Sequence, residues 1–263
     1  MAVREFVLKT KGMEMDCITF GRGSKPLVML QGLNTNGIRG AGVSLALMYR
    51  IFAREYRVYL FDRRKELAQN VTMEELAMDT AAAMEALGIR NADLIGVSQG
   101  GMMAQVLAAK RPDLVRKLVL AVTAGKSGET LNNTIARWVD LTERADWKNL
   151  VADMAYRMYS AKYMRRYRPL LPLLTAVQKP RDVQRFLTLA KTCADFDAEA
   201  LLEEIRCPVY VIGGKRDLVL GEGACEALAR KLGCECHLYE ELGHAAYEEA
   251  RDFNQRIYAF LKE

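Results

Sequence analysis

The chain has 263 residues, 51% of them hydrophobic and 27% charged, with a formal net charge of +5, which is ordinary globular composition and excludes a disordered chain. No run approaches the roughly 18 uninterrupted apolar residues of a membrane span, and the N-terminus lacks the apolar core of a secretory signal, so we expect neither. The six cysteines have no disulfide-framework spacing, which favours reduced thiols and a cytoplasmic location.

Alternating and continuous apolar runs predict a series of short strands. The first two alternate in polarity around a Lys11-Gly12 turn and predict a β-hairpin, whereas the run at 26–30 indicates a strand buried on both faces. The predicted strands cover residues 5–10, 14–20, 26–30, 56–61, a short run at 94–95, 114–122, 208–212 and 234–239.

Helical periodicity fills the gaps between most of these strands. Thr72 and Glu75 form a capping box at the start of one helix, and Gly88 ends it. The other predicted helices cover about 43–54, the stretch from 99 to 111, 223–232 and 247–261. Strands that alternate with helices predict a doubly wound, mostly parallel α/β sheet with helices on both faces.

This alternation stops at Gly125, and the next eighty residues or so contain only helical patterns. These patterns cover 135–139, 150–167, 170–177, 183–193 and 198–205. We therefore expect an α/β core domain made of residues 1–126 and 206–263, with a helical cap at 127–205 inserted after the sixth strand. Doubly wound sheets bind ligands at the C-terminal edge of their strands, and the cap is expected to lie over that edge.

A serine stands at the apex of a predicted strand-to-helix turn in the segment GVSQGG, residues 96–101. Gly96 and Gly100 flank it because the strand and helix backbones pass too closely there for side chains. Such a turn exposes the hydroxyl of Ser98 and aims the following peptide N–H at the same place. The pattern is typical of the nucleophile elbow of serine hydrolases. The alternative interpretation is a glycine-rich turn with a passive serine.

A serine hydroxyl becomes a good nucleophile when a base removes its proton, and histidine suits that task near neutral pH. His244 is predicted in a loop between the last strand and the last helix, where it is free to face a site at the strand ends. His237 is predicted inside an edge strand, on the same side as Glu235 and Tyr239, as a solvent-facing residue. We predict that His244 is the base.

The base needs a carboxylate that accepts a hydrogen bond from the imidazole and stabilises the imidazolium. Asp217 is the first carboxylate after the predicted strand 208–212, and Glu222 is the nearest alternative. The structural alternative for Asp217 is a helix cap or a surface turn residue. We predict that Asp217 orients His244.

The order Ser98, Asp217, His244 is that of the α/β-hydrolases. The sequence resembles that superfamily over nearly its whole length, through the segments LQGLNTNG, FDRR, GVSQGG, IGGKRD and LGHAAYEE. The resemblance implies a mostly parallel eight-stranded sheet, a helical cap and no cofactor. The chain is most similar to the small esterase, lactonase and C–C-bond hydrolase branch, in which the central motif often reads GxSxGG.

The same resemblance implies an oxyanion hole built from the backbone N–H groups of Leu33 and Gln99. The chain departs from the family in one respect, because Gln31-Gly32 stands where the family loop usually reads His-Gly. The hole uses backbone groups, so the loss of the histidine side chain does not empty it. An amide side chain at 31 can still fasten the loop by hydrogen bonds.

Four tyrosines recur at steps of three and four residues and predict one aromatic face on a helix of the cap: Tyr156, Tyr159, Tyr163 and Tyr167. Basic residues surround them: Arg157, Lys162, Arg165, Arg166 and Arg168. One interpretation is an aromatic face that packs on the core domain beside a solvated basic face. The other is a substrate mouth, with Tyr156, Tyr159, Tyr163 and Arg165 favouring anionic substrates. One basic helix is weak evidence for nucleic-acid binding, which we do not predict.

Two further motifs compete with this assignment. The segment TAGKS at 123–127 is similar to a phosphate-binding loop, but Leu120 stands where that loop needs its first glycine. Four residues are metal-ligand types without a known zinc spacing: Cys225, Cys234, Cys236 and His237. We predict buried cysteines and no metal site.

The sequence thus predicts a serine hydrolase that cleaves an ester or related acyl bond of a small molecule through an acyl-enzyme. The same three residues would also serve C–C-bond hydrolysis, lactone opening, aminopeptidase-like cleavage or acyl transfer. A non-catalytic ligand-binding receptor on the same fold is the alternative from another class. A homo-oligomer is compatible with the sequence.

Overall fold

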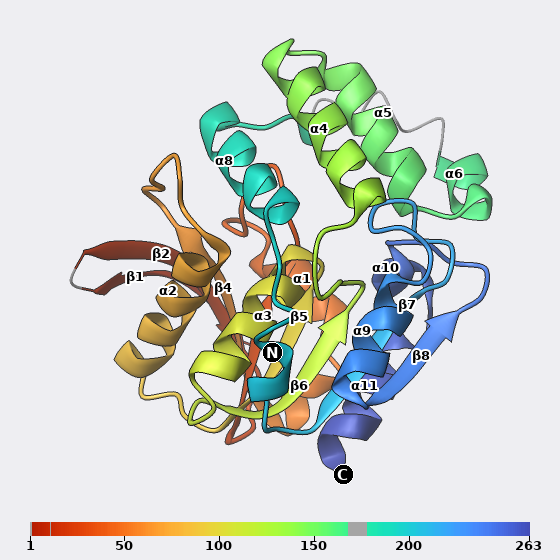
Figure 1. Ribbon diagram of the computed structural model, residues 1–263. Coiled ribbons are helices and arrows are strands. Elements are labelled where there is room, and N and C mark those ends of the chain that lie inside the picture. The colour runs from red at the N-terminus through yellow and green to blue at the C-terminus, as the bar shows by residue number, and fades with distance from the viewer. Residues whose placement is uncertain (1, 11, 168–177) are drawn as a thin grey trace.

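The computed structural model describes residues 2–10, 12–167 and 178–263 and contains one eight-stranded sheet (Figure 1). The strands lie in the order β1-β2-β4-β3-β5-β6-β7-β8. The β1–β2 and β2–β4 pairs are antiparallel, and the pairs from β4–β3 through to β7–β8 are parallel. The strands are β1 Val3–Thr10, β2 Met13–Phe20, β3 Lys25–Leu30, β4 Tyr56–Arg64, β5 Ala92–Val97, β6 Val115–Ala121, β7 Val209–Gly214 and β8 Glu235–Tyr239. The predicted doubly wound, mostly parallel sheet is confirmed.

Ten α-helices and two 3₁₀ turns are found in the described residues, and their labels follow Figure 1. The helices of the sheet layers are α1 Gly42–Met48, α2 Met73–Ala86, α3 Gln99–Lys110, α9 Ala224–Leu232, α10 Ala246–Glu249 and α11 Phe253–Lys262. Those between β6 and β7 are α4 Glu129–Glu143, α5 Trp147–Met158, α6 Ala161–Tyr167 and α8 Val183–Ala194. The 3₁₀ turns are Phe52–Arg54 and Leu202–Glu204.

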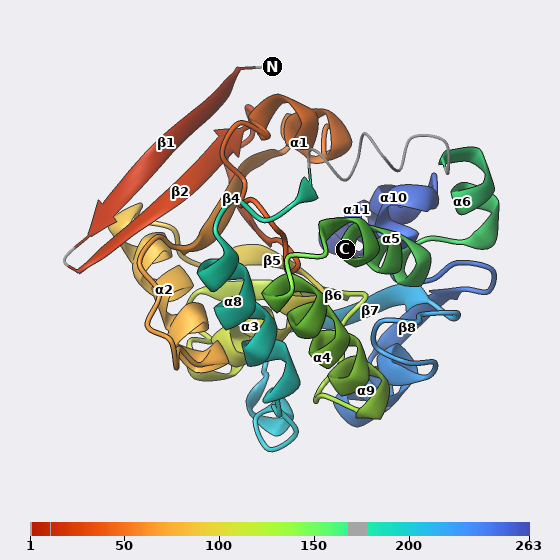
Figure 2. The same ribbon diagram turned by 90° about the horizontal axis from the view of Figure 1, so that it is seen from above.

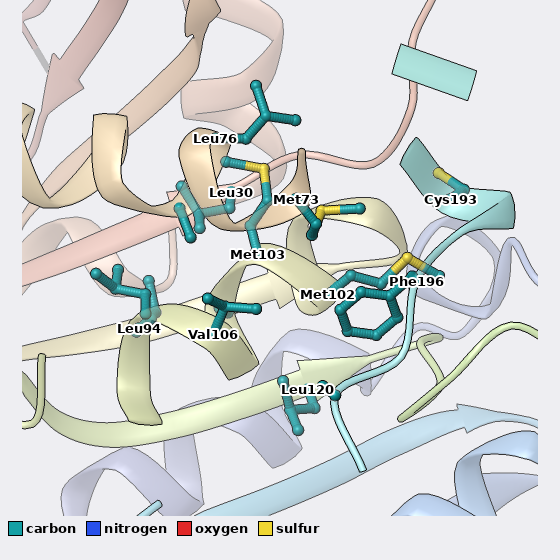
Figure 3. Close-up of a cluster of buried hydrophobic side chains, with 14 of the residues drawn as sticks. Leu30, Met73, Leu76, Leu94, Met102, Met103, Val106, Leu120, Cys193 and Phe196 are labelled. Atoms are coloured by element: carbon teal, nitrogen blue, oxygen red, sulfur yellow. The ribbon is translucent and has the colours of Figure 1, made fainter. Parts of the chain in front are cut away.

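Helices cover both faces of the sheet, so each central strand is buried on both sides. On β3, Val28 and Leu30 join the apolar cluster that includes α2, α3 and α9, whereas Leu27 and Met29 join the cluster that includes α1 and α11. Successive side chains of a strand point to opposite faces, which is why a continuous apolar run predicted this burial. Figure 3 shows part of the first cluster, where Met102 of α3 lies beside Phe196.

The predicted capping box is present at the start of α2. The Glu75 N–H donates to the Thr72 hydroxyl at 3.1 Å, and the Thr72 N–H donates to the Glu75 carboxylate at 2.8 Å. Gly88, just past the end of the helix, has φ of +66°. Signals in the local sequence therefore predicted both ends of this helix correctly.

Two of the helices predicted to pack on the sheet are shorter or interrupted in the structure. The helix expected over 43–54 ends at Met48, and the carbonyl of Ala53 in the following turn accepts the N–H of Arg22 at 2.8 Å. The helix expected over 247–261 divides into α10 and α11, with Asp252 at the division accepting a hydrogen bond from the Tyr239 hydroxyl. These contacts join distant parts of the chain, and helical periodicity contains no information about them.

The prediction of a helix over 198–205 was wrong, because the only helical part of that stretch is the 3₁₀ turn Leu202–Glu204. The Ala198 N–H donates to the carbonyl of Gly125 at 2.9 Å, and Lys126 and Asp197 form an isolated β-bridge. The stretches 125–127 and 196–198 therefore lie side by side.

Helices α4, α5, α6 and α8 lie together above the sheet in Figure 1, and in the view from above, Figure 2, α4 and α8 lie over α3, β5 and β6. The helical pattern predicted at 170–177 lies outside the described residues. Within the part of the chain that the structure describes, none of the helices has both the length and the apolar character that a membrane crossing requires.

Candidate active site

Ser98 lies at the turn between β5 and α3, with φ of +52° and ψ of −120°. A Cβ atom on Gly96 would lie 2.5 Å from the carbonyl oxygen of Gly100, and one on Gly100 would lie 2.1 Å from that of Leu30. These distances are too short for any side chain, so both glycines are required by the close passage of the backbones. A non-glycine residue at positive φ is strained, and such residues cluster at functional sites.

The His244 side chain contacts both of the other residues predicted to act with it. Its Nε2 lies 2.9 Å from the Oγ of Ser98, and its Nδ1 lies 2.7 Å from the Oδ2 of Asp217. The other carboxylate oxygen of Asp217 accepts the N–H groups of Val219 and Leu220 at 2.8 and 2.9 Å. The Asp217 and His244 side chains are buried, whereas Ser98 is partly exposed.

The alternatives to these residues lie elsewhere. Glu222 is exposed. His237 lies on the edge strand β8, where its ring packs edge-on against Tyr239 at 4.8 Å between centroids. Of the cysteines weighed as metal ligands, Cys225 is buried, and burial raises the pKa of its thiol, which donates to the carbonyl of Thr123. No group of three possible metal ligands is found among residues 2–10, 12–167 and 178–263.

The loop after β3 passes directly over Ser98. A Cβ atom on Gly32 would lie 3.3 Å from the Cβ of Ser98, so Leu33 follows at the edge of the site. The Gln99 N–H is the first of α3, and the first N–H groups of a helix have no intrahelical acceptor. Both backbone groups predicted for an oxyanion hole therefore belong to segments that border the Ser98 hydroxyl.

Sequence reasoning missed the role of the Gln99 side chain and of Arg63. The Gln99 side chain is buried, and its Nε2 donates to the carbonyl of Leu189 in α8 at 2.7 Å. Its Oε1 accepts a hydrogen bond from Arg63 at 2.6 Å, and Arg63 also donates to the carbonyl of Gln31. The one signal in the sequence was the position of Arg63, a basic residue at the end of a buried strand.

The tyrosines do not share one helix as predicted. Tyr156 is in α5 with 66% of its surface exposed, and the helix ends before Tyr159, which is extended. Ser160 begins α6, because its hydroxyl accepts the N–H of Tyr163 and donates to the carboxylate of Glu249. The break in the helix is thus stabilised by a residue 89 positions away in the sequence.

Three of the tyrosines nevertheless stack in space. The rings of Tyr159 and Tyr163 have centroids 4.4 Å apart, and those of Tyr163 and Tyr167 are 4.2 Å apart. The Tyr159 hydroxyl donates to Glu248 at 2.6 Å. Arg165 is exposed on α6, and Arg168 lies outside the described residues.

Comparisons with known proteins agree with this architecture. A family model described as alpha/beta hydrolase fold matches residues 25–251. The chain is 22% identical to 3-oxoadipate enol-lactonase 2 of Acinetobacter baylyi, over 97% of this chain and 96% of that protein. It is 23% identical to RutD of Rhizobium rhizogenes, provisionally named a carbamate hydrolase, over 87% of this chain and 91% of that protein.

The crystal structure of the enol-lactonase from Burkholderia xenovorans LB400 is similar to this structure, with a TM-score of 0.85 and 22% identity, covering 98% of this chain and all of that one. The relatives are named as enzymes, which does not support the receptor alternative. The family match over residues 25–251, with a mostly parallel sheet and a strained serine at the turn after β5, shows that this chain is a hydrolase enzyme that belongs to the alpha/beta hydrolase fold family.

Proposed function

We propose that this protein is a serine hydrolase that cleaves an ester or related acyl bond of a small molecule. The observation that carries the proposal is the pair of contacts of His244, 2.9 Å to the Ser98 hydroxyl and 2.7 Å to the Asp217 carboxylate. A base in hydrogen-bonding reach of a nucleophile, itself oriented by a third group, is the arrangement that nucleophilic catalysis needs.

In the acylation step, His244 Nε2 takes the proton of the Ser98 hydroxyl as Oγ attacks the carbonyl carbon. The carbonyl oxygen becomes an oxyanion that the N–H groups of Leu33 and Gln99 stabilise. The intermediate collapses to an ester on Ser98, and the imidazolium donates its proton to the leaving oxygen. Asp217 accepts the Nδ1–H throughout and stabilises the imidazolium charge.

In the deacylation step, water replaces the leaving group. His244 Nε2 takes a proton from the water as its oxygen attacks the acyl carbon, and the same two N–H groups stabilise the second oxyanion. Collapse returns the proton to Ser98 and releases the acid. No cofactor is needed for either step.

Labelling with a fluorophosphonate tests the nucleophile directly, because the reagent forms a covalent bond to an activated serine. We expect one modified residue, Ser98, identified by mass spectrometry of the digested protein. A folded protein in which Ser98 stays unmodified while p-nitrophenyl esters are still hydrolysed would contradict the assignment.

Lactone opening is a second candidate, because a lactone is a cyclic ester and two of the relatives are named enol-lactonases. The two candidates use the same groups on this chain and differ in the shape of the substrate. Parallel assays with a series of lactones and of linear esters of matched size distinguish them by kcat/KM.

We also propose that residues 127–205 form a cap over the site. Two contacts of this segment support the proposal: the Ala245 N–H, next to His244, donates to the carbonyl of Met158 at 2.7 Å, and the Gln99 side chain donates to the carbonyl of Leu189. A segment attached both to the histidine loop and to the serine turn is well located to set substrate access.

The cap supplies candidate substrate contacts. The stack of Tyr159 and Tyr163 supports a tyrosine-lined wall, whereas Tyr156 and Arg165 are exposed and support only contacts at the rim. If the rim attracts anionic substrates, Arg165→Ala should reduce the ratio of kcat/KM for an anionic ester over a neutral one. An unchanged ratio would remove Arg165 from the site.

A further inference from the structure

Arg63 lies at the end of β4, and only 2% of its surface is exposed. Its Nη2 atom donates to the carbonyl oxygen of Gln31 and to the Oε1 of Gln99, both at 2.6 Å. Gln31 begins the loop that carries Leu33, and Gln99 is the residue after Ser98. One nitrogen atom therefore joins the two segments that, in the proposed function, supply the oxyanion hole.

Burying the charged guanidinium of Arg63 costs free energy, and no carboxylate pairs with it directly to offset that cost within the described ranges. Within the described ranges, Arg63 forms no ion pair, and its Nε has no hydrogen-bond partner. The neighbouring Asp62 pairs instead with Arg185 at 3.4 Å and accepts the N–H of Ile38. Burial lowers the pKa of the Arg63 guanidinium. Replacing buried ionic groups by apolar residues of similar volume is often neutral or stabilising in proteins, so stability alone does not account for Arg63.

We propose that Arg63 is a positioning residue that keeps the loop carrying Leu33 and the turn carrying Gln99 in register, so that their two N–H groups converge on one point. This inference rests on the proposed function. The Gln99 amide extends the connection, because its Nε2 donates to Leu189 and Thr192 of α8. The distance between the two N–H groups is thus fixed by the buried side chains of Arg63 and Gln99, which do not contact the substrate.

Loss of this control should affect the transition state more than the bound substrate. The oxyanion carries full charge only after attack, so misplaced donors lower kcat while leaving KM nearly unchanged. A displacement of about 1 Å in a catalytic group costs on the order of 10²-fold in rate. A residue that merely supported the fold would lower the melting temperature without this selective loss of kcat.

The test uses the full chain with Arg63→Met, Arg63→Lys and, as the matched control, Arg64→Met. Methionine removes both hydrogen bonds, whereas the lysine ammonium has three donors on one nitrogen and can retain both. Arg64 is the next residue of the same strand, and its guanidinium pairs with Asp79 away from the serine turn.

We expect Arg63→Met to lower kcat for short p-nitrophenyl esters by about 10²-fold with KM little changed, and Arg63→Lys to recover part of the loss. Arg64→Met should lower the melting temperature and leave kcat unchanged. If Arg63→Met does not fold, Arg63→Lys decides, with a drop in kcat of about tenfold at constant KM expected. Arg63 variants with wild-type kcat, or a drop shared by Arg64→Met, would overturn the proposal.

Hydrogen–deuterium exchange provides a readout that does not depend on activity. Amides of residues 31–35 should exchange faster in Arg63→Met, or in Arg63→Lys, than in the wild type and in Arg64→Met. Unchanged exchange in this segment overturns the role of Arg63. A wild-type protein that neither hydrolyses esters nor reacts with a fluorophosphonate overturns the proposed function instead, and the exchange measurement still decides whether Arg63 holds the loop.

Discussion

Gly214 at the end of β7 packs against Gly243 in the loop that carries His244: a Cβ atom on Gly214 would lie 2.2 Å from the carbonyl oxygen of Gly243. The N–H of Arg216 donates to the carbonyl of Leu242 at 2.9 Å, so two backbones meet directly. Asp217 follows the first of these segments and His244 follows the second. The 2.7 Å contact between their side chains therefore depends on the absence of a side chain at position 214.

The first prediction concerns Gly214→Ala. The added methyl group cannot fit, so the His244 loop must move away from Asp217. We expect kcat/KM to fall by about 10²-fold and the free energy of unfolding to fall by about 1–3 kcal/mol, the usual cost of overpacking. Gly128→Ala is the control, since a Cβ there meets open space. Steady-state kinetics measure kcat/KM, and thermal unfolding measures the loss of stability, for each of the two variants. Wild-type activity in Gly214→Ala would contradict the packing argument.

The second prediction concerns Ser98→Ala. The substitution removes the hydroxyl of the proposed nucleophile and leaves the fold intact, so turnover of p-nitrophenyl esters should fall by several orders of magnitude at an unchanged melting temperature. Ser44→Ala is the matched control, because the Ser44 hydroxyl bonds the carbonyl of Ala41 at an exposed position. Hydrolysis at the wild-type rate by the Ser98 variant would rule out the mechanism.

The third prediction concerns Asp217→Asn. The amide oxygen of Asn can keep the hydrogen bonds from Val219 and Leu220, which turns its NH₂ group toward Nδ1 of His244. The imidazole then carries its proton on Nε2 and cannot accept the proton of Ser98, so kcat should fall by roughly 10⁴-fold with little change in structure.

A matched control for this variant is Asp113→Asn, at an exposed carboxylate paired with Arg90 and Arg111. It should leave kcat unchanged. The combined Ser98→Ala and Asp217→Asn variant should be no slower than Ser98→Ala alone, because the proposed mechanism requires the two residues to act as a unit. Additive losses would show that they act separately.

The fourth prediction concerns Glu249→Ala. The Glu249 carboxylate accepts hydrogen bonds from both the N–H and the hydroxyl of Ser160, where α6 begins. Without it, the junction of α5 and α6 loses two of its hydrogen bonds to α10, and limited proteolysis there should become faster. Glu240→Ala, which removes only a surface pair with Lys215, should leave the cleavage rate unchanged. Equal cleavage in the two variants would show that Glu249 does not hold the junction.

The fold was largely predictable because its signals are local. Continuous apolar runs such as 26–30, the capping box of Thr72 and Glu75, and the glycines around Ser98 each act over a few residues. The same reasoning predicted that Ser98, Asp217 and His244 would meet, since loops at the C-terminal ends of parallel strands share one edge of a sheet. Their side chains lie within hydrogen-bonding distance, and their roles in catalysis stay a prediction.

The sequence by itself thus determined the succession of strands along the chain and the turn at which Ser98 is strained, and it predicted His244 rather than His237 beside Ser98. Tertiary structure alone decided the rest: Glu249 binds Ser160, at the break between α5 and α6, from 89 residues away, and Arg63 reaches Gln99 across 36 residues. Periodicity and capping depend on residues that are close together in the sequence. A buried arginine or a broken helix is stabilised instead by groups that meet only once the sheet has formed.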